Sequence, residues 1–503
     1  MREGLKFLKK HDDVFLAIYL FCIIAGNALN VLISNSDELW NFFNIFKMSN
    51  GFLIYKDLNV IITPLFFYLG KIFLSFADNI LAFRIYNCFL MTFFFLFIYK
   101  IMKKIGFSRF FSFLIMSAIV GFDGFILISG GTNYNILAFT ISLIGIYFLL
   151  EEKTRSNSYC AFLQGMIGAI IFLTKQNIGI LYTIGFIIYT ILQGKILENF
   201  KEKVSNIFKY LIIFIIVLIV FLIGLYFNGN LFGFIDFCFL GIFEFASNNF
   251  LVNGIYFSIL ISLFLLDMFL IFLMNKIDKK IENNKKNNIK ILISFAIPFI
   301  LVGYPIFNKM HCILASLLLF ILLLYLIFKV ILDFKINIKN SKYILRTKNV
   351  FLFIVCMCFL IISANNFIGW YKFVFSDESY IKSDSAFFGG IVQEDLYNNI
   401  KNVTEFIKSS DKQVIIFSPK SALYMTEFKT NNKCFDLPFK GNLGGRGEQG
   451  LIEEIDKLGN VLILIEKNED DLIYQESVMV RNYIIDNLEY IGDIENFSIY
   501  EKN

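Results

Sequence analysis

Charged residues are scarce in this chain of 503 residues. They make up 17% of the sequence, whereas 57% is apolar and 64 residues are phenylalanine. Soluble globular domains carry about 25% charged residues and have no use for so much apolar surface, whereas a bundle of lipid-facing helices does. The low charge content therefore excludes an ordinary soluble protein and indicates an integral membrane protein with several spans.

Metal-site and nucleotide-site signatures are also missing. The chain has two histidines and eight cysteines, and no CxxC or His/Cys ligand spacing, so neither a zinc site nor a disulfide framework is indicated. The glycine-rich stretch KGNLGGRGEQG at 440–450 lacks the strand and helix of a nucleotide site, and we interpret it as a flexible loop. The absence of an evident internal repeat disfavours transporters built from inverted repeats. No nucleic-acid partner is expected.

Apolar runs dominate the first 370 residues. A helix needs about 17–25 residues to cross a bilayer. The first run lacks a small-residue cleavage site and is too long for a signal peptide, so we expect a retained helix. A further run at 61–77 is ambiguous, and its status decides the topology. The eleven runs expected to cross lie at 14–33, 80–101, 109–128, 134–150, 159–174, 177–194, 207–227, 253–274, 290–304, 311–330 and 350–370.

The distribution of basic residues resolves the ambiguity. If 61–77 does not cross and the N-terminus is cytoplasmic, 26 of the 32 basic residues in 1–370 face the cytoplasm, as the positive-inside rule requires. If 61–77 crossed, 22 of those 26 would face outward. We therefore expect one large external loop at 34–79, in which 61–77, with Pro64 and Lys71, lies along the interface. The outward basic residues are then Lys47, Lys56, Lys71, Arg84, Lys175 and Lys309.

The end of the chain has a different character. Residues 371–503 hold 14 basic and 23 acidic residues, against 32 and 18 in 1–370. Short apolar strands at 413–419 and 460–466 alternate with amphipathic helices at 395–409 and 450–459, which is typical of a small α/β domain. We expect a transmembrane module at 1–370 and an extracytoplasmic domain at 371–503. The heavy use of Asn, Lys, Ile and Phe favours the cytoplasmic membrane of a bacterium with an AT-rich genome.

Polar motifs follow the apolar runs in a definite order. SDELWN places Asp37 and Glu38 after the first run, where they act either as helix caps with Ser36 or as catalytic acids. ADNILAFRIYN opens the second run, SGGTNYN follows the third and FLTKQN ends the fifth. Asp57, in YKDLN, is either a turn residue or a further acid of the loop.

The order and spacing of these motifs resemble those of the GT-C glycosyltransferases, in particular the group of bacterial aminoarabinose transferases and protein O-mannosyltransferases. The resemblance covers residues 14–195 and implies a polytopic GT-C-like helical fold with juxtamembrane helices in the first external loop. It also implies that a sugar moves from a polyprenyl-phosphate donor to a glycan, lipid or protein of the cell envelope, on the outer face of the cytoplasmic membrane. Because the donor arrives as a lipid, no nucleotide fold is needed.

The resemblance assigns roles to individual residues. Asp37 would be the base that takes the acceptor proton, and Glu38 would orient substrate or contact a metal. The departing phosphate needs cations. A lysine at 175 could instead snorkel to headgroups, Arg84 could anchor its helix, and a lone interfacial histidine is often a structural hydrogen-bond former. The candidates for binding the phosphate are Lys175, Lys309, Arg84 and His311.

Two departures from the family pattern favour a different sugar. Related transferases often carry an acid after the third helix, where this chain has Asn133, Tyr134 and an asparagine at 135, and Asp123 could supply that acid. Thr63 precedes the juxtamembrane proline where the aminoarabinose enzymes have a lysine. Contacts to sugar, acceptor or metal are then expected from Glu38, Asp57, Asn133, Tyr134 and Asp123. A divalent cation is left open.

Two other classes of protein were compared with this hypothesis. An envelope polysaccharide polymerase or ligase is also polytopic, but its main loop tends to come late in the chain. A lipid-linked-sugar transporter or flippase needs charged residues at mid-membrane, for which Asp123 and Asp267 are the clearest candidates. Asp236 and Glu244 lie in a second external stretch, where they could line either a sugar cleft or a transport vestibule.

Overall fold

A computed structural model describes most of the chain, and all structural statements below refer to the residues that it describes. Two expectations from the sequence, the span at 350–370 and Asp123, lie outside these residues. The described residues are 12–28, 36–77, 79–119, 133–151, 158–193, 199–248, 251–277, 283–331, 380–382, 391–418, 421, 424, 443–467 and 477–502.

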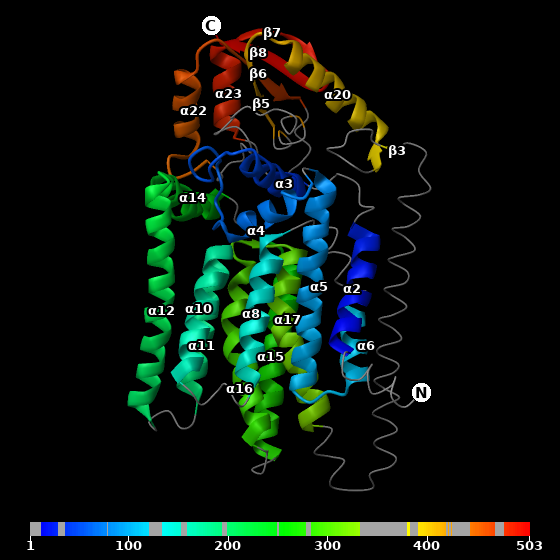
Figure 1. Cartoon of the computed structure of the whole chain (residues 1–503), viewed down its shortest axis with the longest axis vertical. Coiled ribbons are helices and arrows are strands. Elements are labelled where there is room, and N and C mark those ends of the chain that lie inside the picture. Colours follow the sequence, from blue (N-terminus) through cyan, green and yellow to red (C-terminus); the bar gives the residue numbers. More distant parts are fainter. Residues whose placement is uncertain are drawn as a thin grey trace.

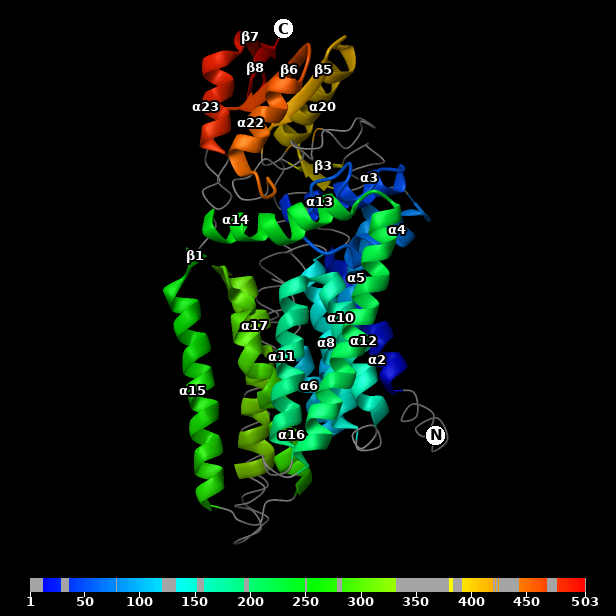
Figure 2. The same ribbon diagram turned by 90° about the vertical axis from the view of Figure 1, so that its left-hand side faces the viewer.

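The larger part of the molecule is a bundle of apolar helices that run along its long axis (Figures 1 and 2). Each predicted crossing that falls on described residues overlaps one of these helices. Five helical segments are long and apolar enough to cross a membrane by themselves, and the others are shorter. The total of eleven crossings stays a prediction. The helices are α2 (Asp12–Ala28), α5 (Ile80–Lys104), α6 (Arg109–Ile119), α8 (Tyr134–Leu150), α10 (Ser158–Thr174), α11 (Gln176–Leu192), α12 (Phe200–Phe227), α15 (Gly254–Ile277), α16 (Asn283–Phe299) and α17 (Lys309–Tyr325).

The helices differ in how much of their apolar surface the bundle covers. In α5, 72% of the most apolar window is buried inside the protein, whereas in α12 and α15 only 11% is. An apolar helix surface that the protein leaves exposed is suited to contact with lipid. Glycines bring α12 close to α10: a Cβ at Gly165 would lie 2.4 Å from the carbonyl oxygen of Tyr210. Such close backbone approach at small residues is typical of helix packing in membranes.

Short elements lie across the end of the bundle that faces the C-terminal domain (Figure 2). Helix α4 (Leu65–Leu74) follows Pro64 and has ten residues. At 1.5 Å per residue it rises about 15 Å, half of a hydrocarbon core, so it is too short to cross. The other elements here are α3 (Ser36–Ser49), α13 (Leu231–Ile235), the π-helical turn η2 (Asp236–Leu240), α14 (Gly241–Asn248), the 3-10 turn η3 (Ile300–Gly303) and the parallel strands β1 (Leu251–Val252) and β2 (Ile306–Phe307); the π-helical turn η4 (Leu326–Ile331) extends α17 at the opposite end.

The C-terminal domain is a small three-layer α/β unit. Its sheet has the strand order β5-β6-β8-β7, in which β5 and β6 are parallel and the other pairs antiparallel. Helix α20 packs on one face, and α22 and α23 pack on the other. The predicted strands and helices are present, while α23 and the β7–β8 hairpin were not foreseen. The elements are β5 (Gln413–Phe417), β6 (Val461–Glu466), β7 (Glu489–Ile494), β8 (Phe497–Lys502), α20 (Glu394–Ser409), α22 (Gly447–Lys457) and α23 (Val478–Asn487), with a separate pair β3 (Tyr380–Lys382) and β4 (Ile391–Gln393).

Candidate active site

A cavity of about 290 Å³ opens where the bundle meets the short crossing elements. It is lined by segments that are far apart in the sequence: α3, the chain before α4, the starts of α8, α11 and α17, and one face of α14. Asp37, Lys175 and His311 all line it, and so do Asn133 and Tyr134. The structure thus brings together five of the candidate residues that the sequence indicated.

Three helices of the bundle begin at this cavity. The N-cap residues of α8, α11 and α17 are Asn133, Lys175 and Asn308, and each lines the cavity wall. The N-terminus of a helix carries about half a positive charge and unpaired N–H groups. The N-cap residue of α11 makes no side-chain cap, and in the first turn Oδ1 of Asn177 accepts the N–H of Ile178 at 2.9 Å. The cavity is therefore suited to an anion, and phosphate is a common ligand at such helix ends.

Lys175 is placed between α10 and α11 with an extended backbone. Its ammonium group donates to Oδ1 of Asn135 and lies 4.9 Å from the centre of the Tyr134 ring. A lysine at a helix N-terminus opposes the helix dipole, so this position gives no local stability. Burial lowers the pKa of Lys175 to about 8, and the neighbouring charge of Asp37 resists that shift. A partly desolvated ammonium beside a helix N-terminus is well suited to receive a phosphate.

Asp37 lies in the first turn of α3 and faces the same cavity. Burial raises the pKa of its carboxyl above the ordinary value, and the positive charge of Lys175 opposes the shift. The interpretation of Asp37 as a helix cap accounts for its place in the first turn. It does not account for a carboxylate that shares a cavity with a half-buried lysine, which is an arrangement typical of catalytic sites.

His311 is held in one orientation by the cap of α17. Oδ1 of Asn308 accepts the backbone N–H of His311 at 3.0 Å and also lies 2.8 Å from Nδ1 of the ring. The backbone contact identifies this atom as the amide oxygen, which can only accept. Nδ1 must therefore carry a proton, and in the neutral ring Nε2 is a hydrogen-bond acceptor. In that form His311 suits a substrate hydroxyl better than a phosphate.

Glu38 and Arg84 are paired with each other rather than with the cavity. Nε of Arg84 lies 3.0 Å from Oε1 of Glu38 and Nη2 lies 3.2 Å from Oε2, and both side chains are buried. Neither residue lines the cavity. The bidentate pair joins α3 to α5, so in this structure the two residues position the turn that carries Asp37. The sequence-based roles of phosphate ligand for Arg84 and substrate contact for Glu38 therefore find no geometric support.

This pair gives a stability prediction. In Glu38→Gln the Arg84 charge stays buried without a counterion, which typically costs about 3–5 kcal/mol of unfolding free energy. Thermal unfolding in detergent should show a clear loss of stability. The matched control is Glu453→Gln, which breaks a largely exposed ion pair with Arg446 and should cost less than about 1 kcal/mol. Equal stability of the Glu38→Gln variant and the unaltered protein would show that the buried pair contributes nothing.

Two other candidates lie away from the cavity. Asp57 accepts the backbone N–H of Leu53 at 2.8 Å, so it closes a turn of the first loop as the turn interpretation predicted. Lys309 is exposed and does not line the cavity. Thr63, which stands where the aminoarabinose enzymes have a lysine, is buried and donates to the carbonyl oxygen of Phe172 at 2.7 Å. This hydrogen bond connects the first loop to α10.

Sequence reasoning missed several residues of the site. Trp40, one turn after Asp37, lines the cavity, and its buried indole N–H finds no hydrogen-bond partner in the part of the chain that the structure describes. Gln176 and Asn308 were not singled out, although an asparagine three residues before an apolar run is a recognisable N-cap signal. The wall formed by Ile242, Phe245 and Ala246 of α14 carries no chemical motif. Only the folded chain places that wall opposite Lys175.

The acids at this site do not fit a divalent cation. Both carboxylate oxygens of Glu38 are taken by Arg84, and Asp37 stands beside the ammonium of Lys175. Over the described part of the chain, no group of three or more His, Cys, Asp or Glu side chains is arranged to hold a metal.

The structure combines a bundle of apolar helices, short helices across one end of it and a small α/β domain. No family model matches the chain, and no curated protein matches it in sequence. The fold is similar to the crystal structure of ArnT from Cupriavidus metallidurans bound to undecaprenyl phosphate, with a TM-score of 0.56 and 9% identity over 100% of this chain and 98% of that chain. The apo structure of the same protein gives a TM-score of 0.50 at 9% identity, over 99% and 98% of the chains. The expected helical membrane fold with a small C-terminal α/β domain is thereby confirmed as similar to that of ArnT, while the eleven crossings and the details of the first loop stay predictions. At this identity the likeness concerns the fold alone.

Proposed function

We propose that the protein is a membrane glycosyltransferase that moves a sugar from a polyprenyl-phosphate donor to a cell-envelope acceptor. The observation that carries this proposal is one cavity that joins a carboxylate, Asp37, to an anion site formed by Lys175 and helix N-termini. A transfer from a lipid phosphate needs these two parts: a base for the nucleophile and positive charge for the leaving group. The similar structure of ArnT was solved with undecaprenyl phosphate, which agrees with a lipid-phosphate ligand.

The proposed chemistry is a single displacement. An acceptor hydroxyl or amine attacks the anomeric carbon while Asp37 takes its proton, and the bond between that carbon and the phosphate oxygen breaks. The phosphate leaves with the bonding electron pair, and Lys175 and the N-terminus of α11 stabilise its negative charge. Asn133 and Tyr134 line the same cavity and would contact the sugar. Nε2 of His311 would accept a hydrogen bond from a sugar or acceptor hydroxyl.

The outer face of the membrane is the proposed place of the reaction. The cavity lies at the end of the bundle that carries the C-terminal domain (Figure 1). With 26 of 32 basic residues assigned to cytoplasmic segments, the positive-inside rule puts this end outside and the N-terminus inside. The acceptor would then be a glycan, lipid or protein of the bacterial envelope.

One observation favours the transporter as second candidate. Asp267 of α15 is fully buried, and among the described residues neither of its carboxylate oxygens has a hydrogen-bond partner. An acid of this kind within a membrane helix often belongs to a proton or substrate pathway. Asp267 does not line the cavity that contains Asp37 and Lys175, so the transferase explains more of the site.

A reconstitution assay tests the proposal. The purified chain in proteoliposomes would receive a panel of polyprenyl-phosphate sugars with an envelope extract as acceptor, and free polyprenyl phosphate would be measured by mass spectrometry. The transferase releases polyprenyl phosphate in step with the labelling of an acceptor. Movement of the intact donor between leaflets without its cleavage would instead support the transporter.

The lowered pKa of Lys175 predicts a pH dependence for binding. The ammonium is protonated below about 8 and loses its charge as the pH rises through that value. The affinity for undecaprenyl phosphate should therefore hold up to pH 8 and then fall by about tenfold for each further pH unit, because one proton is lost from the free protein. Titrations in detergent from pH 7 to 9.5 would measure this. A flat profile would show that binding does not depend on a lysine with a lowered pKa.

A further inference from the structure

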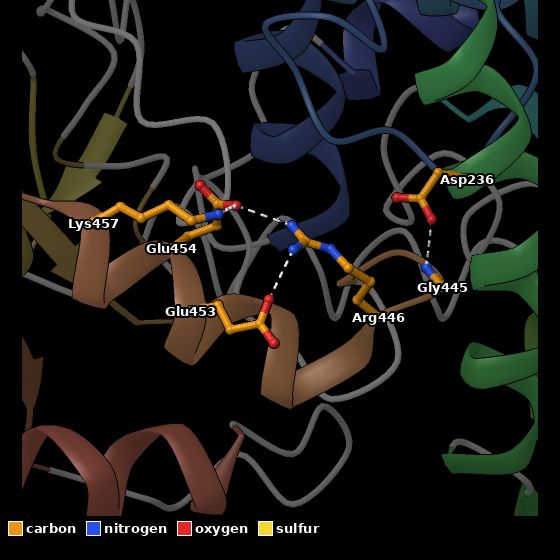
Figure 3. Close-up of polar contacts among 6 residues, drawn as sticks. All are labelled: Asp236, Gly445, Arg446, Glu453, Glu454 and Lys457. Carbon is orange, nitrogen blue, oxygen red and sulfur yellow. Dashed lines mark hydrogen bonds and ion pairs between the residues drawn. The ribbon is translucent and has the colours of Figure 1, made fainter.

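A glycine-rich loop of the C-terminal domain contacts η2, the turn that leads into the wall of the cavity formed by α14. The backbone N–H of Gly445 donates to Oδ1 of Asp236 in η2 at 3.0 Å, across 209 residues of sequence (Figure 3). A Cβ at Gly445 would lie 2.7 Å from Cβ of Leu240, and one at Gly444 would lie 2.6 Å from Oδ2 of Asp236. Gly444 also has φ +77°, which favours glycine. The part of the predicted flexible loop that is described is thus docked against η2.

The side chain of Arg446 points away from this contact. It forms ion pairs with Glu453 at 3.0 Å and Glu454 at 2.9 Å on its own helix α22, and Glu454 also pairs with Lys457 (Figure 3). These exposed pairs hold the end of the loop against α22. Among the described residues, the contact with η2 is made by the glycine backbone and Asp236. The charge of Arg446 adds a longer-range attraction to Asp236.

The opposite side of η2 is bonded to the anion site. Nε2 of Gln176 donates to the carbonyl oxygen of Cys238 at 3.2 Å and to that of Ile61 at 3.0 Å. Gln176 is the residue directly after Lys175 and the first of α11. Helix α14 continues from η2 and supplies Ile242, Phe245 and Ala246 to the cavity wall. A π-helical turn such as η2 is rare and is often found at functional sites.

From this chain of contacts we infer that the C-terminal domain positions the anion site of the enzyme through η2, with Asp236, Gly445 and Gln176 as positioning residues. This inference rests on the proposed function. The domain holds α14 against the cavity and keeps Lys175 desolvated beside Asp37. If the contact between Gly445 and Asp236 opens, the wall formed by α14 is in its binding-competent position in a smaller fraction of the molecules. The apparent affinity for the lipid phosphate then falls in proportion to that fraction.

Two glycines of the C-terminal domain give a matched test. Gly445→Ala adds one methyl group where Leu240 and Asp236 leave no room, whereas Gly459→Ala adds the same group where no atom lies within 4 Å. Undecaprenyl phosphate is the probe, and its binding to the full chain in detergent is measured from pH 7 to 10. Gly445→Ala should bind about tenfold more weakly, and Gly459→Ala should bind as the unaltered protein does.

A change in the pH profile separates positioning from simple loss of structure. Burial lowers the pKa of Lys175 to about 8. If the wall formed by α14 moves and lets water reach Lys175, the pKa should rise, and the pH at which the affinity begins to fall should rise with it. Asp236→Ala removes the carboxylate that accepts the N–H of Gly445 and adds no atoms. This variant should also bind undecaprenyl phosphate more weakly, and its affinity should begin to fall at a higher pH. The inference is overturned if both variants bind with unchanged affinity and profile, or if Gly459→Ala loses as much. If the unaltered protein fails to bind the probe, the proposed function itself fails.

Discussion

Replacing Asp37 by asparagine is expected to abolish sugar transfer while leaving the lipid phosphate bound. The amide keeps the size of the side chain but cannot take a proton from the acceptor, and the loss of a general base typically lowers kcat by on the order of 10²–10⁴-fold. Asp37 also places a carboxylate in the cavity that we propose receives the phosphate. Removing that carboxylate should leave the affinity for undecaprenyl phosphate unchanged or higher.

The split between transfer and binding makes this result specific. A variant that had merely lost its structure would lose both. Asp57→Asn is the matched control, because it alters another acid of the same loop that closes a turn and does not line the cavity. It should retain transfer. Turnover by Asp37→Asn at the rate of the unaltered enzyme would remove Asp37 from the role of base.

Replacing Lys175 by methionine is expected to remove most of the affinity for the lipid phosphate. The ammonium is the one cationic side chain among the described residues of the cavity lining, apart from the ring of His311. Truncating one partner of a buried, hydrogen-bonded charge pair costs about 2–5 kcal/mol, which corresponds to a loss of about 30-fold or more. The pH dependence of binding above 8 should disappear as well.

Lys309 supplies the control for this experiment. It starts α17 next to the cavity but is exposed and does not line it, so Lys309→Met should bind undecaprenyl phosphate with nearly unchanged affinity. Equal losses in the two variants would point to a general attraction of anionic lipid by surface charge. Full affinity in Lys175→Met would contradict the anion site described here.

The helices of the bundle could be predicted because a bilayer imposes a simple rule on sequence. Runs of apolar residues must be long enough to cross, and basic residues report which loops stay inside. The β7–β8 hairpin escaped prediction because its strands carry little apolar pattern: β7, EYIGDI, is the edge strand and buries none of its side chains, and β8, FSIYEK, buries only Phe497 and Ile499. β6 was found because every residue of VLILIE is buried between two helical layers.

The site could be predicted only in part, because residue type does not distinguish a ligand from a structural partner. Asp37 and Lys175 were placed together through the resemblance of motif order. Glu38 and Arg84 belong to the same motifs, yet they neutralise each other across 46 residues of sequence. The wall formed by α14 and its contact with Gly445 depend on close backbone approach, which leaves no chemical pattern in the sequence beyond a group of glycines.

The place where the phosphate of a lipid carrier binds can be seen in a cryo-EM structure of the chain in nanodiscs with undecaprenyl phosphate. We expect phosphate density within hydrogen-bond distance of Lys175 Nζ and the first N–H groups of α11, in the cavity that Asp37 also lines. Phosphate density elsewhere, with none in this cavity, would show that the anion site is not formed by Lys175 and α11.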